Sequence, residues 1–221
     1  LFSQYKEESI HGRYITLDSI EPLLQKLNTN NQLRIIGKSV LKKPIYSYKI
    51  GKGKTKIFLW SQMHGNESTT TKALFDFLNV LHSGSELAQQ LLNAFTFYSI
   101  PMLNPDGVNL VNGSLNFNSN AYTYARYTAR KYPDVPFPSG WKANINGVDL
   151  NLQFPSGWEN AKKIKYSQGY TSPSPMNYVG SAPLTEPEAQ ALYNFTLSHN
   201  FRIMLTYHTQ GKEIYWQFQN Y

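Results

Sequence analysis

Cysteine is absent from this chain of 221 residues. Its absence excludes disulfides and every metal site that depends on thiolate ligands, so any metal must be held by His, Asp or Glu. It does not decide the compartment, because a reducing cytoplasm and a cysteine-poor bacterial exoprotein are both compatible with it.

Long apolar runs are absent as well, and no stretch is long enough to span a membrane. Residues 1–8 lack the charged segment and the apolar stretch of a signal peptide, although a mature form with its signal removed would look the same. Hydrophobic residues make up 41% of the chain, which is enough for a proper core. Because neither a linker nor a repeat interrupts the pattern, we expect one domain over residues 1–221.

Clusters of basic residues are also absent. The formal net charge is +7, but Lys and Arg are scattered singly and no nucleic-acid motif accompanies them, so we do not expect nucleic-acid binding. The charge indicates either solubility or attraction to an anionic polymer such as a cell wall. Aromatic residues are plentiful (16 Tyr, 12 Phe, 4 Trp), which suits core packing or a groove for a peptide or sugar-like ligand.

Apolar periodicity predicts an α/β domain. Short apolar or alternating runs predict strands over residues 33–40, 45–50, 56–60, 95–103 and 201–207. Apolar stripes predict a helix that ends at Leu27 and is capped by Asp18 or Ser19, and further helices over residues 68–81, 87–92 and 185–198. We therefore expect a mixed, mostly parallel twisted sheet with helices on both faces.

The remaining segments predict one turn, one helix cap and one long irregular region. Residues 104–107 (Asn-Pro-Asp-Gly) predict a turn after the fourth strand. Thr185 and Glu188 predict a capping box at the start of the last helix. Between Val111 and Ala182, Asn, Ser, Tyr, Pro and Gly dominate and periodicity is lost, which predicts a long loop region with a functional role or an insertion.

His64 and Glu67 form half of a candidate metal site. They follow a buried strand at a strand-to-helix corner, where positions i and i+3 can face one point. His208 follows the last strand in the same way, and strand C-termini are where sites form in open α/β sheets. Catalytic zinc takes three N or O ligands, lowers the pKa of its water and polarises a carbonyl. Taken alone, the pair fits equally well a helix start with Glu67 near the dipole and His64 as a cap.

Five motifs, in order along nearly the whole chain, favour the metal. They are His64-Gly65-Asn66-Glu67, Asn104-Pro105-Asp106-Gly107, Asn146-Gly147-Val148-Asp149-Leu150-Asn151, Leu184-Thr185-Glu186-Pro187-Glu188 and Tyr207-His208. On these motifs the chain resembles the zinc carboxypeptidase family. The resemblance implies zinc held by His64, Glu67 and His208, and an eight-stranded mixed sheet flanked by helices. It also implies that Asp149 hydrogen-bonds a zinc-bound histidine.

The substrate-binding positions depart from the family pattern. In carboxypeptidases of this family an Asn-Arg pair binds the terminal carboxylate of the substrate; Asn151 matches the Asn, but Leu152 stands at the Arg. Leucine cannot hold a carboxylate bidentately, so removal of a free C-terminal residue by that clamp is not expected. Lys142 stands where the family has the residue that polarises the carbonyl; an exposed loop cation is the equally weighted alternative.

The second half of the chain resembles one bacterial branch. Residues 149–159, 173–180 and 207–211 are similar to γ-D-glutamyl-diamino acid endopeptidases, which cut peptidoglycan stem peptides. Residues up to about Leu110 look like general bacterial zinc carboxypeptidases. The family's general base is a glutamate on a strand beyond the third zinc ligand, and Glu213 has no evident aim at the metal. We therefore expect a chain truncated at its C-terminus, with the catalytic glutamate beyond Tyr221.

Three functions follow from these features. The first is zinc-dependent hydrolysis of a γ-D-glutamyl-diamino acid bond in peptidoglycan stem peptides. The second is carboxypeptidase action on ordinary peptides, and the third is a silent zinc- or peptide-binding module. For the chain as printed we expect zinc binding with poor hydrolysis, a monomer, and a secreted or wall-associated location with the cytoplasm as the alternative.

Overall fold

The computed structural model describes residues 3–10, 12 and 14–216. The strands are β1 (Leu33–Lys38), β2 (Pro44–Gly51), β3 (Thr55–Trp60), β4 (Phe95–Ile100) and β5 (Ile203–Thr206). The α-helices are α1 (Leu17–Leu27), α2 (Ser68–His82), α3 (Glu86–Ala94), α4 (Pro105–Val111), α5 (Asn120–Ala129), α6 (Trp158–Ser167) and α7 (Pro187–Leu197). The 3-10 helices are η1 (Ser3–Tyr5), η2 (Glu8–Ile10) and η3 (Leu150–Leu152).

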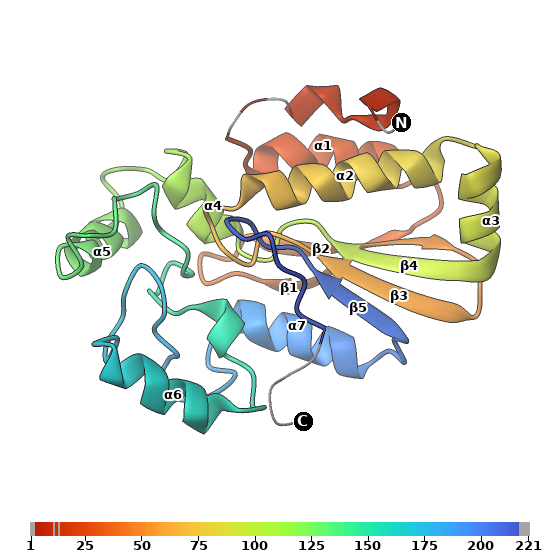
Figure 1. The fold of residues 1–221 in the computed structure, drawn as a ribbon. Helices are drawn as coiled ribbons and strands as arrows, with labels where there is room; N and C mark the ends of the chain where they lie inside the picture. Colours follow the sequence, from red (N-terminus) through yellow and green to blue (C-terminus); the bar gives the residue numbers. More distant parts are fainter. Residues whose placement is uncertain (1–2, 11, 13, 217–221) are drawn as a thin grey trace.

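The strands form one mixed sheet in the order β1-β2-β4-β3-β5. The pairs β1–β2 and β2–β4 are antiparallel, whereas β3 runs parallel to both β4 and β5. Helices α1 and α2 cover one face of the sheet and α7 covers the other, which confirms the predicted α/β class (Figure 1). The described residues contain five strands of the eight that the family resemblance implied.

The core lies on both faces of the sheet because successive strand residues point to opposite sides. Leu59 and Phe97 pack toward α1 and α2, while Phe58 and Tyr98 pack toward α7. Phe58 is fully buried, and burying a side chain of that size stabilises the fold by roughly 2 kcal/mol. The central strand β3 ends directly before residues 61–67, so this core fixes the base of the candidate site.

The starts of α1 and α4 differ from the prediction. The cap of α1 is Thr16, whose hydroxyl and backbone N–H face the Ser19 side chain, rather than Asp18 or Ser19. The predicted turn at residues 104–107 is wrong because this segment begins α4: Asn104 accepts from Gly107 N–H, and proline is favoured at the first helical position.

The start of α7 also differs. Its cap is Glu186, not Thr185, and the predicted capping box is absent. The Thr185 backbone N–H and hydroxyl instead approach the Gln153 side-chain oxygen at 2.8 and 3.1 Å. A tertiary partner has therefore replaced the local bond that the sequence pattern suggested.

The predicted loop between Val111 and Ala182 contains two helices, so the prediction was wrong for α5 and α6. Helix α6 buries only Trp158, and α5 buries only Ala125, Thr128 and Ala129. Such narrow contacts leave no apolar stripe in the sequence from which helical periodicity could be recognised. A third core cluster, which includes Ala125 and Trp141, holds this region against the end of α4.

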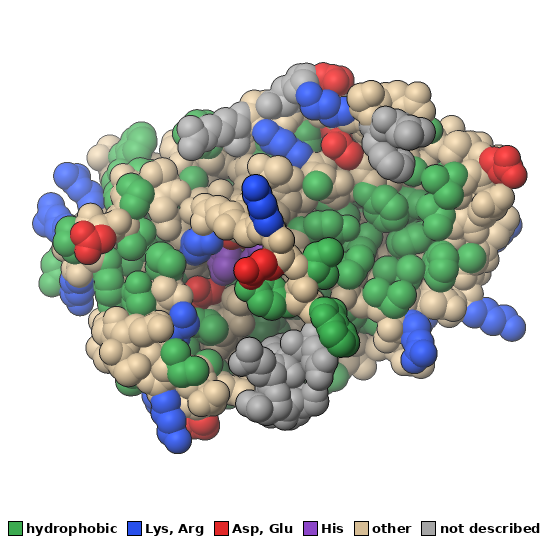
Figure 2. All heavy atoms as spheres, viewed as in Figure 1, with side chains coloured by type: hydrophobic (Ala, Val, Ile, Leu, Met, Phe, Trp, Pro, Cys, Tyr) green, Lys and Arg blue, Asp and Glu red, His purple; other side chains and the backbone are tan. Residues whose placement is uncertain are grey.

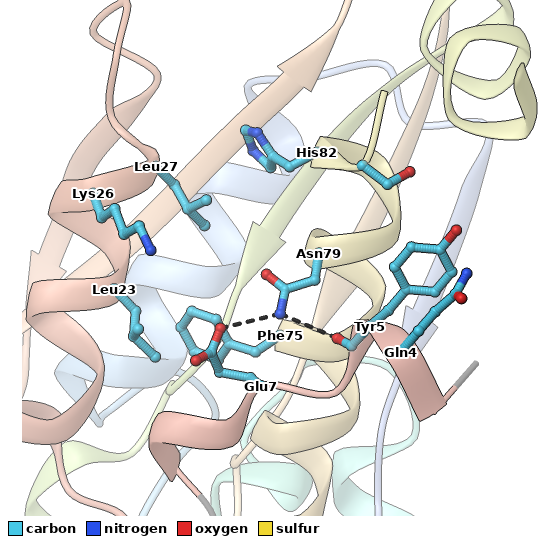
Figure 3. Close-up of a pocket in the computed structure, with 10 residues that line it drawn as sticks. Gln4, Tyr5, Glu7, Leu23, Lys26, Leu27, Phe75, Asn79 and His82 are labelled. Carbon is cyan, nitrogen blue, oxygen red and sulfur yellow. Dashed lines mark hydrogen bonds between the residues drawn. The ribbon is translucent and has the colours of Figure 1, made fainter. Parts of the chain in front are cut away.

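A cavity of about 400 Å³ lies between η1, α1 and α2 (Figure 3). Asn79 on α2 donates hydrogen bonds to the Tyr5 carbonyl and to Glu7 Oε2, at 3.1 and 3.0 Å. These bonds attach the N-terminal segment to the second half of α2. Among the described residues, no helix combines the length and apolarity that crossing a membrane requires.

Candidate metal centre

Residues 61–67 leave β3 and enter α2 along a path fixed by backbone hydrogen bonds. Ser61 N–H donates to the Ile100 carbonyl, and Gly65 N–H donates to the Lys142 carbonyl. The Asn104 amide donates to the Met63 carbonyl at 3.1 Å. The loop is therefore held from three directions before its functional side chains are considered.

Gly65 is required by a close approach of two backbones. A Cβ atom at Gly65 would lie 2.7 Å from the Gly107 carbonyl carbon and oxygen, a separation that real Cβ atoms do not adopt. Gly107 is similarly confined by the Ala143 carbonyl at 2.7 Å. The glycines of two sequence motifs thus bring the loop after β3, the start of α4 and the segment around residue 143 together.

His64, Glu67 and His208 converge on one point. His64 Nδ1 lies 3.1 Å from Glu67 Oε1, and His208 Nδ1 lies 3.1 Å from Glu67 Oε2. One potential ligand atom from each residue lies within 4.8 Å of the others. His208 arrives because β5 pairs in parallel with β3, with Trp60 opposite Thr206, so both strands end at the same edge. Figure 2 shows histidine side chains recessed in the surface between basic and acidic groups.

Asp149 lies behind His64. Its Oδ1 is 3.0 Å from His64 Nε2, and the carboxylate also accepts from the backbone N–H groups of Asn151 and Asn177. This carboxylate favours the tautomer with the proton on Nε2 and leaves the Nδ1 lone pair directed at Glu67. Asp149 thus makes the contact with a histidine that the family resemblance implied.

The electrostatics of the group show how strongly its members interact. Burial alone would lower the pKa of His64, but Asp149 and Glu67 outweigh it and raise this pKa to about 9. Burial alone would raise the pKa of Glu67, whereas hydrogen bonds from His208, His64 and Lys142 hold it below its ordinary range. Burial alone would also raise the pKa of Asp149, but the charge of His64 and the hydrogen bond to it lower this pKa below its ordinary value.

The donor set fits a zinc ion. Each contact between an Nδ1 atom and Glu67 is favourable only if a proton or a cation lies between nitrogen lone pair and carboxylate. Ligands about 2.1 Å from a tetrahedral zinc ion lie roughly 3.4 Å apart, close to the 3.1 Å separations here. Two imidazoles and one carboxylate are also a known ligand set of catalytic zinc. A divalent cation would therefore satisfy all three groups together.

Lys142 enters the centre instead of lying in an exposed loop. Its Nζ is 2.9 Å from Glu67 Oε1, and its side chain keeps only 17% of its surface exposed. The Lys142 N–H donates to the Pro175 carbonyl, and its own carbonyl accepts from Gly65, so the backbone aims the side chain at the ligands. The alternative of an exposed loop cation is therefore wrong.

Asn151 and Leu152 lie in η3, directly after Asp149. Asn151 is exposed and Leu152 is half-buried. The structure therefore brings Asn151 beside the Asp149 carboxylate, while its contact with a substrate stays a prediction. Glu213 is exposed and accepts a hydrogen bond from the Tyr215 hydroxyl; that it does not serve the metal stays a prediction.

Sequence reasoning missed a set of buried polar residues beneath this centre. Asn144 donates to the carboxylates of Glu186 and Glu188, at 2.6 and 3.2 Å. Both glutamates belong to a motif that was interpreted as a helix cap. The only signal in the sequence was the pair of acidic residues around Pro187, which fits a helix start equally well.

The chain is similar to known peptidases over most of its length. A family model described as zinc carboxypeptidase matches residues 19–221. The chain is 42% identical over 194 residues to gamma-D-glutamyl-L-diamino acid endopeptidase 1 of Lysinibacillus sphaericus, covering 84% of this chain and 47% of the relative. It is 38% identical over 197 residues to the uncharacterized protein YqgT of Bacillus subtilis (strain 168), covering 84% and 50%.

The fold is similar to that of solved carboxypeptidases. Carboxypeptidase A from Helicoverpa armigera superposes with a TM-score of 0.64 at 19% identity, over 92% of this chain and 49% of that one. At this identity the likeness concerns the fold alone. The chain spans about half the length of the curated relatives named above.

Proposed function

This chain belongs to the zinc carboxypeptidase family, and from that premise we propose that it binds one zinc ion through His64, Glu67 and His208. The observation that carries this proposal is the convergence of two imidazole nitrogens on the two oxygens of one buried carboxylate. Asp149 supports it, because a carboxylate on the far nitrogen is the usual outer partner of a zinc-binding histidine.

We further propose that the protein hydrolyses γ-D-glutamyl-diamino acid bonds in peptidoglycan stem peptides. A relative of that name is 42% identical to this chain. Leu152 supports an internal bond over a C-terminal one, because it cannot bind a terminal carboxylate as arginine does. The net charge of +7 supports attraction to an anionic wall and thus a secreted or wall-associated location.

The side chains have separable roles in this proposal. When bound, zinc would act as a Lewis acid that polarises a scissile carbonyl. It would also lower the pKa of water, so that a nucleophile is available near neutral pH. Asp149 holds the proton on His64 Nε2 and so orients the imidazole. Lys142 places a positive charge inside the centre, where it would stabilise negative charge that develops on the carbonyl oxygen. Asn151, the exposed middle residue of η3, would contact the substrate.

One observation favours a silent binding module as the second candidate. The two carboxylates of the centre, Glu67 and Asp149, already have hydrogen-bond partners. Glu67 contacts both histidines and Lys142, and Asp149 contacts His64. Neither is therefore free to act as a general base. Under this candidate the chain holds zinc and peptide but does not cleave.

A substrate comparison tests these alternatives. The full-length protein, loaded with zinc, is offered a γ-D-glutamyl-diaminopimelate peptide and, in parallel, an ordinary peptide with a free C-terminal residue. The proposal predicts cleavage of the γ-glutamyl bond, lost on chelation and restored by zinc, with no release from the ordinary peptide. Release of the C-terminal residue would indicate a carboxypeptidase instead. Zinc binding without cleavage of either peptide would indicate the binding module.

A further inference from the structure

We infer that Asn144 is a positioning residue of the metal centre, because its buried side chain ties the segment carrying Lys142 and Asp149 to the start of α7. The inference deepens the proposed function and rests on the proposed zinc site. None of the side-chain hydrogen bonds of Asn144 reaches His64, Glu67 or His208, so it would act through its neighbours. It is fully buried in a chain where most asparagines are not.

The Asn144 amide uses both of its ends. Its Oδ1 accepts from the backbone N–H groups of Asn146 and Val148, both at 3.1 Å. Its Nδ2 donates to Glu186 Oε2 at 2.6 Å and to Glu188 Oε2 at 3.2 Å. The Asn144 N–H also donates to the Val148 carbonyl at 2.9 Å, which closes the turn. One side chain therefore sets the shape of the turn and anchors it to a helix.

The two ends of this segment both reach zinc-binding side chains. Lys142, two residues before Asn144, contacts Glu67 at 2.9 Å. Asp149, one residue after Val148, contacts His64 at 3.0 Å. Because so few residues separate these positions, a shift of the turn would displace both contacts together. A shift of about 1 Å at an orienting group is enough to impair a site of this kind.

The carboxylates that receive Asn144 are not explained as helix caps. Glu186 makes no side-chain bond to the N–H groups that begin α7, and it accepts a second bond from Asn146 Nδ2 at 2.9 Å. Glu188 Oε1 accepts from Val40 N–H, in the turn between β1 and β2. Burying two carboxylates is costly unless their bonds are made. Besides the Thr185 hydroxyl on Glu186 and the Glu188 backbone N–H on its own carboxylate, their partners lie in the turn and the sheet edge, as positioning of the segment requires.

The test exchanges donor and acceptor across the central bond. In Asn144→Asp, the acceptor for Asn146 and Val148 is kept, but the donor is lost and a third carboxylate is added. In the double variant N144D/E186Q, the new amide at position 186 can donate to the new carboxylate at position 144, which restores a bond of reversed polarity. Zinc affinity is measured by competition with a chromogenic chelator, and the Co²⁺ absorption spectrum reports the ligand geometry.

We expect Asn144→Asp to weaken zinc binding about 10- to 100-fold, the range found for residues that support metal ligands, and to alter the Co²⁺ spectrum. The double variant should recover part of both, because the new carboxylate at position 144 still faces that of Glu188. Asn79→Ala is the matched control, because it removes two hydrogen bonds near the far end of α2 (Figure 3) and should leave zinc affinity unchanged. If Asn144→Asp does not fold, Glu186→Ala should show a smaller loss in the same direction.

The inference would be overturned if folded Asn144→Asp had the zinc affinity and the Co²⁺ spectrum of the wild type. It would also be overturned if the double variant recovered neither the zinc affinity nor the spectrum. His208→Ala separates this failure from that of the proposed site. If His208→Ala loses zinc while Asn144→Asp retains it, only the positioning role of Asn144 is wrong. If His208→Ala binds zinc as tightly as the wild type, the zinc site itself is wrong.

Discussion

The two halves of the candidate metal centre differ in how they are held, one by buried contacts and the other at the outer strand of the described sheet. His64 and Glu67 are buried in a loop held by the β4 end, the start of α4 and the Lys142 segment. Among the described residues, His208 follows β5, the outermost strand of the sheet, whose four residues are all exposed, and its side chain keeps 31% of its surface exposed. Apolar side chains gather on the surface over the part of the molecule where β5 lies (Figures 1 and 2).

This difference indicates which half the protein orders by itself. The buried half is fixed by packing and by hydrogen bonds that do not involve a metal. Within the described residues, the half that carries His208, here called the edge half, depends on one paired strand, β3, and on the contact between His208 and Glu67. Edge strands open more readily than central ones. A bound cation should therefore order the edge half much more than the buried half.

The largest expected effect comes from breaking the buried half. Glu67→Gln removes a charge that is 1% exposed and leaves the Lys142 ammonium without its partner. Breaking a buried pair in this way costs roughly 3–5 kcal/mol, or roughly 10 °C in the melting temperature of a domain of this size. His208→Gln, at the exposed edge, should cost under about 1 kcal/mol. Calorimetry of the chelated variants measures both, and equal losses would contradict the comparison.

The buried network around Asn144, which includes Glu188, should respond to pH. Burial raises the pKa of Glu188 to about 7, from an ordinary value near 4.5. The folded protein therefore binds the Glu188 proton more tightly than the unfolded chain, so its stability falls as pH rises from about 4.5 to about 7 and then levels off. The loss from this group is about 3 kcal/mol, at 1.4 kcal/mol per pKa unit.

Urea unfolding at pH 5 and pH 7.5 measures this loss as a difference between variants. Glu188→Gln should flatten the dependence, whereas Glu159→Gln, at an exposed position, should not. An unchanged dependence in Glu188→Gln would show that Glu188 does not bind its proton more tightly in the folded protein.

The smallest expected effect is on backbone amide exchange at the edge. Zinc should slow exchange in β5 and at His208 by a larger factor than in β3, because β3 is already protected on both sides. Hydrogen exchange with and without zinc compares the two strands within one sample. Equal slowing in β3 and β5 would mean that the metal tightens the whole domain and not the edge half.

The sequence predicted the strands, the α/β class and the close pair of candidate ligands, His64 and Glu67, because each of these depends on local patterns. The convergence of His208 was predicted through its place at a strand end and through the order of motifs. The Lys142 contact was left open, because it joins residues 75 positions apart in the chain. Helices α5 and α6 were missed because they bury too few side chains to show periodicity.

The buried network around Asn144 lay beyond prediction for a different reason. The sequence near Pro187 has the composition of a helix start, and local rules assign its carboxylates to the helix. In the structure these carboxylates bind a turn more than 40 positions away. Only tertiary contact distinguishes these two uses of the same residues.

Zinc content under matched conditions tests the central claim most directly. The wild type, His208→Ala and the control His199→Ala are dialysed against the same buffered zinc, and metal and protein are then quantified. We expect one zinc per chain in the wild type and in His199→Ala, and much less than one in His208→Ala. Equal zinc in His208→Ala and the wild type, or none in the wild type, would contradict a centre formed by His64, Glu67 and His208.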